Sequence, residues 1–116
     1  MALLAQTTVF VMPSVSEPFG IAALEAMAAE VPVVISRNAG VAEVVRAAVT
    51  VDAGDAAGVA SAVLDLIRSP DKAQAMATAA REEARALDWP TAATKLLDVY
   101  RASLVVTAAG ANEPLK

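Results

Sequence analysis

Three short apolar segments separated by helical stretches constrain the fold of this chain most strongly. They are residues 8–12, 32–35 and 49–51, and each contains β-branched residues. An apolar run of this length, bounded by turn residues, is typical of a strand that is buried on both faces. Strands that alternate with helices imply parallel pairing through right-handed crossovers, so the sequence predicts an α/β fold.

Helices are expected between and after these strands, and we place them at residues 20–29, 40–46, 55–68, 72–87 and 91–106. Asp55 is expected to cap the third helix, because an aspartate directly before apolar residues at helical spacing is a typical N-cap. In the first helix Ile21, Leu24 and Ala28 share one face. Three short parallel strands normally belong to a larger sheet. The sequence therefore predicts a partial Rossmann-like domain that ends in a helical C-terminal segment.

The length and the composition limit the size of the core. The 116 residues suffice for at most one domain. Apolar residues make up 57% of the chain, but many are alanine, and aromatic residues make up only 3%. Because alanine buries little area, the core is expected to depend on Val, Leu and Ile, with Phe10, Phe19 and Trp89. We assign residues 1–106 to one partial domain and residues 107–116 to a flexible tail.

The charge balance and the missing residue types exclude several functions. The net charge of −4 and the pI near 4.6 argue against binding of nucleic acid. The sequence has no cysteine and no histidine, which excludes disulfides, thiolate catalysis, histidine metal sites and histidine-based triads. No apolar run approaches the ~18 residues of a transmembrane helix, and no charged signal-peptide segment begins the chain. We therefore expect a cytoplasmic protein.

Residues 17–25 form the candidate functional site, at the turn between the first expected strand and the first helix. Glu17 and Glu25 are eight positions apart, and Glu25 lies about 7.5 Å along the helix at ~1.5 Å of rise per residue. The free amides of Phe19, Gly20 and Ile21, with the positive end of the helix, form an anion site suited to phosphate. Open α/β sheets bind ligands at such turns. The alternative is that Gly20 only shapes the entry into the helix.

The two glutamates need a task that is compatible with a nearby phosphate. A carboxylate beside a phosphate is repelled unless it binds a hydrogen-bond donor, and two carboxylate oxygens match a pair of vicinal hydroxyls. A nucleotide sugar offers one diol on its hexose and one on its ribose. The alternative for Glu25 is an ordinary solvated residue on a helix surface.

Residues 13–28 resemble the E-x7-E signature of family 4 glycosyltransferases, which are retaining enzymes with the GT-B fold. The similarity continues through residues 31–34, 40–45, Asp55 with its helix, Trp89 and the last helix up to Tyr100. It covers about residues 8–102. The resemblance implies that the chain is the second half of a GT-B C-terminal domain, which binds the sugar donor.

The resemblance also implies a role for each residue of the turn. Glu17 would be the catalytic-site residue that binds hydroxyls of the donor sugar near the reacting carbon. Glu25 would bind the ribose hydroxyls of the nucleotide. The backbone amides of Phe19, Gly20 and Ile21 would hold the diphosphate. The donor is a substrate, so no cofactor is implied, and no cluster of residues here requires a metal.

In this family an Arg and a Lys from the upstream part of the same domain neutralise the leaving diphosphate. The chain therefore resembles a fragment that binds a nucleoside diphosphate sugar, depends on the remainder of a parent enzyme, and has little hexosyltransferase activity alone. One alternative is a non-catalytic fragment that self-associates through its open sheet edge. Another is a different GT-B enzyme, such as a sugar-nucleotide epimerase.

The sequence departs from the family pattern at three places, one of which is Ala47 and Ala48 in place of a more polar loop. Glu30 stands where the family has glycine, and because a left-handed backbone disfavours other residues, the first helix is expected to end differently here. Residues 38–40 contain one glycine where many members have two. Arg37, Glu43 and Trp89 are weaker candidates, and we interpret them as a solvated arginine, a helix-surface residue and a packing anchor.

Overall fold

The structure, a computed structural model, describes residues 3–110, with side chains described as far as Leu104. In chain order the elements are η1 Leu4–Gln6, β1 Phe10–Met12, α1 Ile21–Ala28, β2 Val33–Ser36, η2 Gly40–Glu43, β3 Val49–Val51, α2 Ala56–Arg68, α3 Pro70–Ala86 and α4 Trp89–Gly110. The chain divides into two compact units, one ending at Ala86 and the other beginning at Leu87. The predicted alternation of strands and helices is confirmed, except that the helix expected at residues 40–46 is only a short 3-10 helix, Gly40–Glu43.

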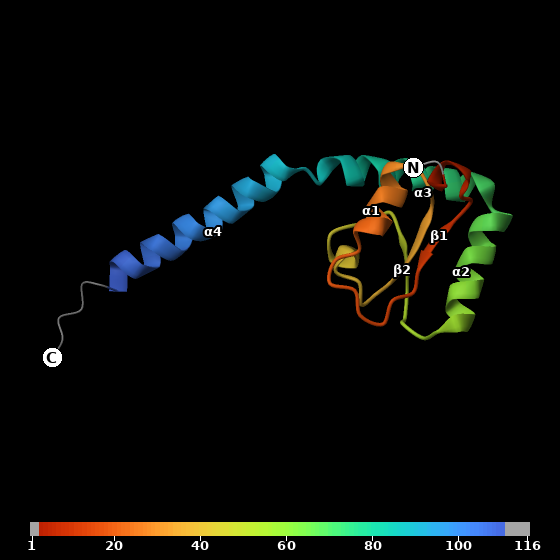
Figure 1. The fold of residues 1–116 in the computed structure, drawn as a ribbon, viewed down its shortest axis with the longest axis horizontal. Coiled ribbons are helices and arrows are strands. Elements are labelled where there is room, and N and C mark those ends of the chain that lie inside the picture. The colour runs from red at the N-terminus through yellow and green to blue at the C-terminus, as the bar shows by residue number, and fades with distance from the viewer. Residues whose placement is uncertain (1–2, 111–116) are drawn as a thin grey trace. The chain divides into compact units, whose positions relative to one another are not determined.

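The three strands form one parallel sheet in the order β1-β2-β3 (Figure 1). In the register, Val11 lies opposite Val34, and Ile35 lies opposite Thr50. The predicted strands and their parallel pairing are confirmed, with β2 beginning one residue later than expected. The carboxyl ends of all three strands therefore meet at one edge of the sheet, which is where the 13–20 loop leaves β1.

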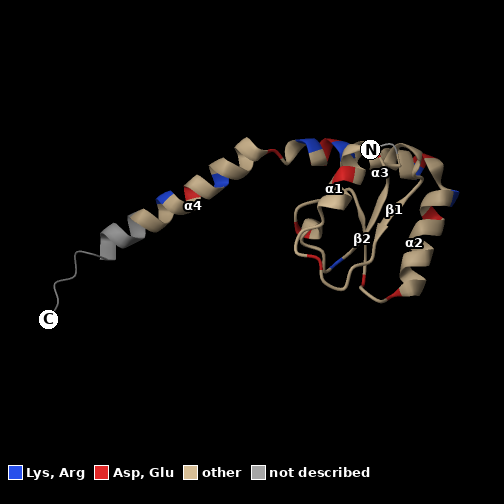
Figure 2. Cartoon of the chain, in the orientation of Figure 1, with Lys and Arg blue, Asp and Glu red and all other residues tan. Residues whose placement is uncertain are grey.

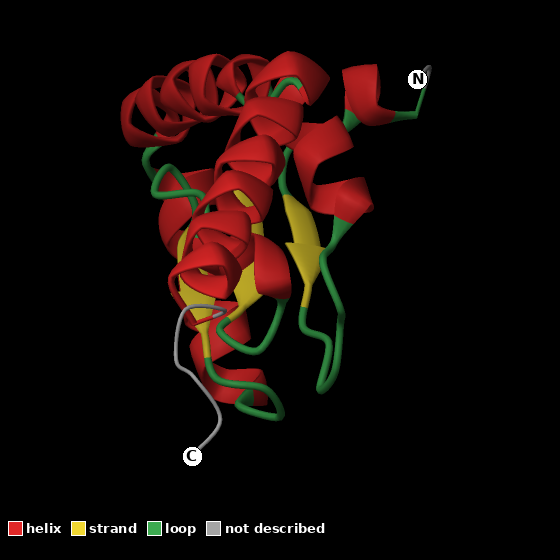
Figure 3. Ribbon diagram, turned by 90° about the vertical axis from the view of Figure 1, so that its left-hand side faces the viewer, coloured by secondary structure: helices red, strands yellow, loops and turns green. Residues whose placement is uncertain are grey.

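Side chains of β2 enter two separate cores, one on each face of the sheet. Val33 and Ile35 pack with Met27 of α1 in the first core. Val34 packs with Leu66 of α2 in the second core. Helices of the first unit flank the strands on both sides (Figure 3). A strand whose side chains are all buried explains why β2 reads as a continuous apolar run.

Helix α1 buries a face made of small residues and one methionine. Ala23, Ala26 and Met27 are fully buried, whereas Ile21 is 67% exposed. The face shared by Ile21, Leu24 and Ala28 is therefore largely exposed, with only Leu24 packed partly against the first core. Small alanine side chains let α1 approach the sheet and α3 closely, which fixes the helix more tightly than a large residue would.

Helix α2 begins as the sequence predicts. The Asp55 side chain accepts a hydrogen bond from the amide of Gly58 at 2.9 Å, which caps the helix. Basic and acidic residues are interspersed along α3 (Figure 2). Two of the three aromatic residues expected in the core are exposed instead: Phe19 is 40% exposed, and Trp89, in the second unit, is 88% exposed.

The end of α1 also differs from the expectation. The amide of Glu30 donates to Met27 O at 2.9 Å, and the amide of Val31 donates to Ala26 O at 3.0 Å. These two bonds form a Schellman motif, in which Glu30 takes the left-handed position with φ of 60°. Helix α1 therefore ends in the left-handed conformation that is typical of glycine, although the residue there is Glu30.

Contacts with α3 hold Glu30 in this conformation. One carboxylate oxygen accepts hydrogen bonds from Thr78 at 2.9 Å and from Gln74 at 3.2 Å, and the other accepts from Arg81 at 2.8 Å. The three partners lie at helical spacing on one face of α3. Hydrogen bonding from Thr78, followed by that from Arg81, lowers the pKa of Glu30 below its ordinary value. We infer that this network stabilises the strained backbone.

Substitutions at Glu30 separate the backbone strain from the side-chain bonds. Glu30→Ala loses the bonds to α3 and keeps a Cβ at positive φ, whereas Glu30→Gly loses the same bonds and relieves the strain. We expect the alanine variant to have a lower Tm than both the parent chain and the glycine variant, measured by circular dichroism at pH 7. Equal Tm values for the two variants would contradict the role of backbone strain.

The lowered pKa of Glu30 predicts how its contribution depends on pH. A carboxyl whose folded pKa lies below its unfolded value of 4.5 stabilises fully above that pH and loses the effect as the pH falls through the folded pKa. The Tm difference between the parent chain and Glu30→Gln is therefore expected to shrink below pH 4.5. A difference that stays the same from pH 7 to pH 3 would show that ionised Glu30 does not stabilise the fold.

Candidate functional site

Gly20 turns the chain from the 13–20 loop into α1. Its backbone is left-handed, with φ of 104°, and it occupies the N-cap position of the helix. A Cβ built at Gly20 would lie 2.8 Å from Met12 Cε and 3.0 Å from Val41 Cγ1. The left-handed backbone therefore favours glycine, and a Cβ would in addition force the Met12 and Val41 side chains to shift. This turn places the N-terminus of α1 at the carboxyl edge of the sheet.

The amides at this turn are the ones for which the sequence predicts an anion site. The amide of Ala23 donates to Gly20 O at 3.0 Å, whereas the amide of Ile21, at the first position of α1, has no carbonyl one turn before it in the helix and lies at the positive end of its dipole. The amide of Phe19 donates to Glu17 Oε1 at 3.3 Å. An anion that binds the Phe19 amide must therefore displace the Glu17 carboxylate, which frees this carboxylate for another donor.

The two glutamates lie on either side of Gly20 along the chain. Glu17 is half-buried in the loop, whereas Glu25 is exposed on α1. Glu25 follows Ile21 by four residues, so the two share one face of the helix, and Ile21 is 67% exposed. Glu25 therefore lies about 6 Å along the helix axis from its first residue, on a face open to a ligand.

The segment after β2 crosses the 13–20 loop at this site. Ala39 forms a parallel bridge with Glu17, and the amide of Gly40 donates to Glu17 O at 3.1 Å. A Cβ at Gly40 would lie only 2.3 Å from Pro18 O. This contact was not predicted from the sequence, although Gly40, just after the second strand, is a residue type that permits such close approach.

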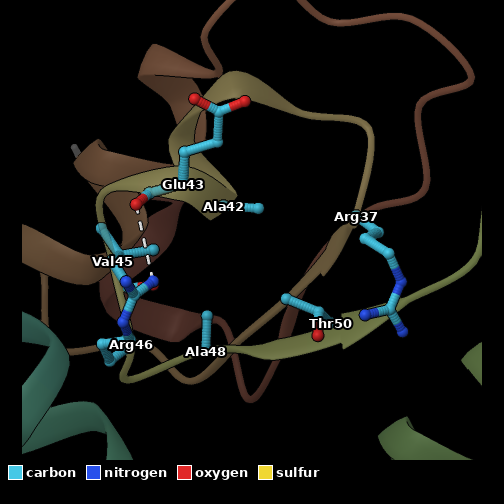
Figure 4. Close-up of a pocket in the computed structure, with 7 residues that line it drawn as sticks. All are labelled: Arg37, Ala42, Glu43, Val45, Arg46, Ala48 and Thr50. Atoms are coloured by element: carbon cyan, nitrogen blue, oxygen red, sulfur yellow. Dashed lines mark hydrogen bonds between the residues drawn. The ribbon is translucent and has the colours of Figure 1, made fainter.

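Arg37 and Glu43 belong to a different part of the surface. Arg37 Nε pairs with Asp52 Oδ1 at 2.9 Å, and both side chains are mostly exposed. A cavity of about 350 Å³ is lined by Arg37, Ala42, Glu43, Val45, Arg46, Ala48 and Thr50 (Figure 4). Its lining includes none of the residues of the candidate site. Arg37 and Glu43 therefore remain outside the Gly20 turn.

A second cavity lies beside the start of the 13–20 loop. It has a volume of about 410 Å³ and is lined by Pro13, Val15, Gly54, Asp55, Ala56, Val59 and Ala60. Among the described residues, no group of three or more acidic side chains is arranged to hold a metal ion. In the same part of the chain, no helix has the length and apolarity needed to span a bilayer.

Comparisons with known proteins identify relatives that match most of the chain. The family model for glycosyl transferases group 1 matches residues 1–83. Glycogen synthase of Mycobacterium tuberculosis (strain ATCC 25618 / H37Rv) is 41% identical over 89% of this chain and 26% of the relative. Alpha-maltose-1-phosphate synthase of the same strain is 40% identical over 85% of this chain and 28% of the relative. The chain thus spans about a quarter of the length of these relatives.

Solved structures show the same fold. Sucrose-phosphate synthase (tll1590) from Thermosynechococcus elongatus superposes with a TM-score of 0.74 and 30% identity, covering 90% of this chain and 27% of that protein. Anabaena Alr3699/HepE in complex with UDP superposes with a TM-score of 0.75 and 24% identity, covering 86% of this chain and 29% of that protein. These structures confirm the predicted fold class, part of a GT-B domain. On the family match and these relatives, the chain belongs to the glycosyl transferases group 1.

Proposed function

We propose that residues 17–25 bind a nucleoside diphosphate sugar, as part of an enzyme that transfers a hexose to an acceptor with retention of configuration. One observation carries the proposal: the left-handed Gly20 starts α1 at the carboxyl edge of the sheet, with a glutamate on either side. Membership of the glycosyl transferases group 1 supports it. The site combines an anion-binding helix end with two acceptors for hydroxyl groups.

Each residue of the turn has a proposed task. The amides of Phe19, Gly20 and Ile21 bind the diphosphate, where the helix dipole favours negative charge. Once the diphosphate takes the Phe19 amide, Glu17 accepts hydrogen bonds from the donor sugar. Glu25, exposed and farther along α1, accepts hydrogen bonds from the ribose. No covalent step is assigned to Glu17, which orients the sugar while the diphosphate departs.

The remainder of the enzyme is proposed to complete the reaction. Because the chain spans about a quarter of its relatives, the acceptor site and the cations that neutralise the leaving diphosphate are assigned to the part beyond it. We therefore expect this chain to bind the donor with little turnover. We place the enzyme in the cytoplasm.

Nucleotide binding by this chain tests the proposal directly. UDP, present in complexes of the Anabaena neighbour, is the first ligand to test, followed by GDP and ADP. A nucleotide at about 100 times its dissociation constant adds about 2.7 kcal/mol to the stability, so a rise of several degrees in Tm is expected. Glu25→Gln is expected to reduce the rise, because the neutral amide is a weaker acceptor for ribose hydroxyls.

The control for this experiment is Glu82→Gln. Glu82 lies on α3, where it pairs with Arg85 at 3.1 Å, and it takes no part in the proposed site. This variant loses the same unit of charge and is expected to keep the full nucleotide-induced rise in Tm. A parent chain that melts cooperatively with no shift in any nucleotide would overturn donor binding by this chain.

Gly20→Ala tests whether the shape of the turn is required. Gly54 also has a left-handed backbone, with φ of 85°, but a Cβ there would meet nothing within 4 Å. Both substitutions place a Cβ on a left-handed backbone, but only Gly20→Ala also brings that Cβ into close contact with Met12 and Val41. It is therefore expected to destabilise the fold more than Gly54→Ala and to abolish nucleotide binding. If Gly20→Ala bound nucleotide as tightly as Gly54→Ala, the amides at the turn would not be the phosphate site.

We also propose that the outer edge of β1 is open to a partner strand, from the remainder of the enzyme or from a second copy. In the described residues β1 pairs only with β2. The amide of Phe10 donates to Pro32 O at 2.9 Å, so that of Val11 points to the opposite edge. An unpaired edge is a template for strand pairing.

Light scattering over a series of concentrations measures self-association. We expect the mass to rise above the 11.8 kDa of one chain, with slower hydrogen exchange of the Val11 amide at high concentration. A constant monomer mass would contradict pairing between copies, and a rising mass with unchanged exchange at Val11 would place the contact elsewhere.

A further inference from the structure

The 13–20 loop is held by a second segment, residues 36–41, which we call the bracing segment. Three carbonyls at alternate positions of the loop, those of Val15, Glu17 and Phe19, accept hydrogen bonds from it. Alternate carbonyls that point to one side are typical of an extended chain beside a partner strand. Within it, Ala39 and Glu17 form one isolated parallel bridge beyond the ends of β1 and β2.

Two of the three bonds come from the backbone. The amide of Gly40 donates to Glu17 O at 3.1 Å, and the amide of Val41 donates to Phe19 O at 2.6 Å. These bonds hold the loop on both sides of Pro18. They also require close approach of the two chains, which the absence of a side chain at Gly40 permits.

The third bond comes from a side chain. Asn38 Nδ2 donates to Val15 O at 3.2 Å, across 23 positions of sequence. The amide of Asn38 is itself bound to Ser36 Oγ at 3.1 Å, and Ser36 is fully buried at the end of β2. Asn38 is therefore anchored to the sheet at one end and reaches the loop two residues before Glu17 at the other.

We propose that Asn38 is a positioning residue for donor binding. It acts through Glu17 and the amide of Phe19. The backbone of the bracing segment bonds to Glu17 and Phe19, whereas the Asn38 side chain supplies the bond to Val15, at the start of the loop. Without it, the loop is held only from Glu17 onward. The glutamate carboxylate and the Phe19 amide then sample more orientations, and each donor bond costs more ordering free energy. This inference rests on the proposed function of the turn.

Hydrogen exchange without ligand tests the positioning role. The amides of Gly40 and Val41 report on the two backbone bonds to the loop. In Asn38→Ala we expect both amides to exchange about two- to tenfold faster, the range for loss of one supporting hydrogen bond. Amides of β2 such as that of Ile35 are expected to keep their exchange rates. Unchanged rates at Gly40 and Val41 would overturn the inference.

Two further variants separate the side-chain donor from other effects. Asn38→Asp keeps the size of the side chain but places a carboxylate opposite Val15 O. In this variant the amides of Gly40 and Val41 are expected to exchange at least as fast as in Asn38→Ala. Arg37→Ala removes the neighbouring side chain, which pairs with Asp52 and not with the loop, so the exchange rates are expected to stay at the parent values. If Asn38→Asp behaved as the parent chain, the donated hydrogen bond would not be the cause.

Calorimetric titration with the nucleotide that stabilises the parent chain supplies the second readout. Asn38→Ala is expected to weaken binding about two- to tenfold, in line with one lost hydrogen bond, with little change in Tm because the side chain is exposed. Faster exchange with unchanged nucleotide affinity would overturn the link to donor binding. A third outcome is that Asn38→Ala exchanges faster but even the parent chain binds no nucleotide. This result would overturn the proposed function, and Asn38 would then only hold the loop in place.

Discussion

The crossing of two backbones at the carboxyl edge of the sheet is the constraint on which the rest of the site depends. Each backbone carries a glycine where the other passes. A Cβ at Gly40 would lie 2.3 Å from Pro18 O, and a Cβ at Gly20 would lie 3.0 Å from Val41 Cγ1. A side chain at Gly40 would therefore force the two backbones apart, and one at Gly20 would displace Val41. The position of the loop therefore determines where α1 begins, and with it the direction in which its first amides point.

Helix α1 carries this constraint from the loop to the opposite end of the first unit. Its N-terminus is fixed by Gly20 and its C-terminus by the bonds between Glu30 and α3. Between them, the buried Ala23 and Ala26 bring the helix close to its neighbours, and the larger Met27 packs in the first core. The polar contacts at both ends of the helix add to this packing. Glu25 lies between these two ends, so both of them help to fix its position relative to the sheet.

The sequence predicts what depends on local pattern. Valine-rich runs identified all three strands, and Asp55 identified the start of α2. The sequence left the buried face of α1 undecided, because alanine contrasts weakly with its neighbours; the structure buries Ala23, Ala26 and Met27 and exposes the large Ile21. The end of α1 was mispredicted because the bonds of Glu30 to Thr78, 48 positions away, outweigh a local preference for glycine. The family resemblance located the candidate site, but the bond from Asn38 depends on tertiary contact that no local pattern records.

The charge balance of the turn indicates what must come from outside the first unit. Glu17 and Glu25 both repel a diphosphate, and the amides at the start of α1 offset this only with partial charges. Arg37, the cation nearest in sequence to the ends of the strands, is bound to Asp52. Within the described part of the first unit, the amides at the start of α1 are therefore the groups that we propose to compensate the ligand. We infer that donor binding by this chain is weaker than in a complete enzyme, where further cations contribute. Catalysis demands more of those cations than binding does, because negative charge builds up on the diphosphate as it departs.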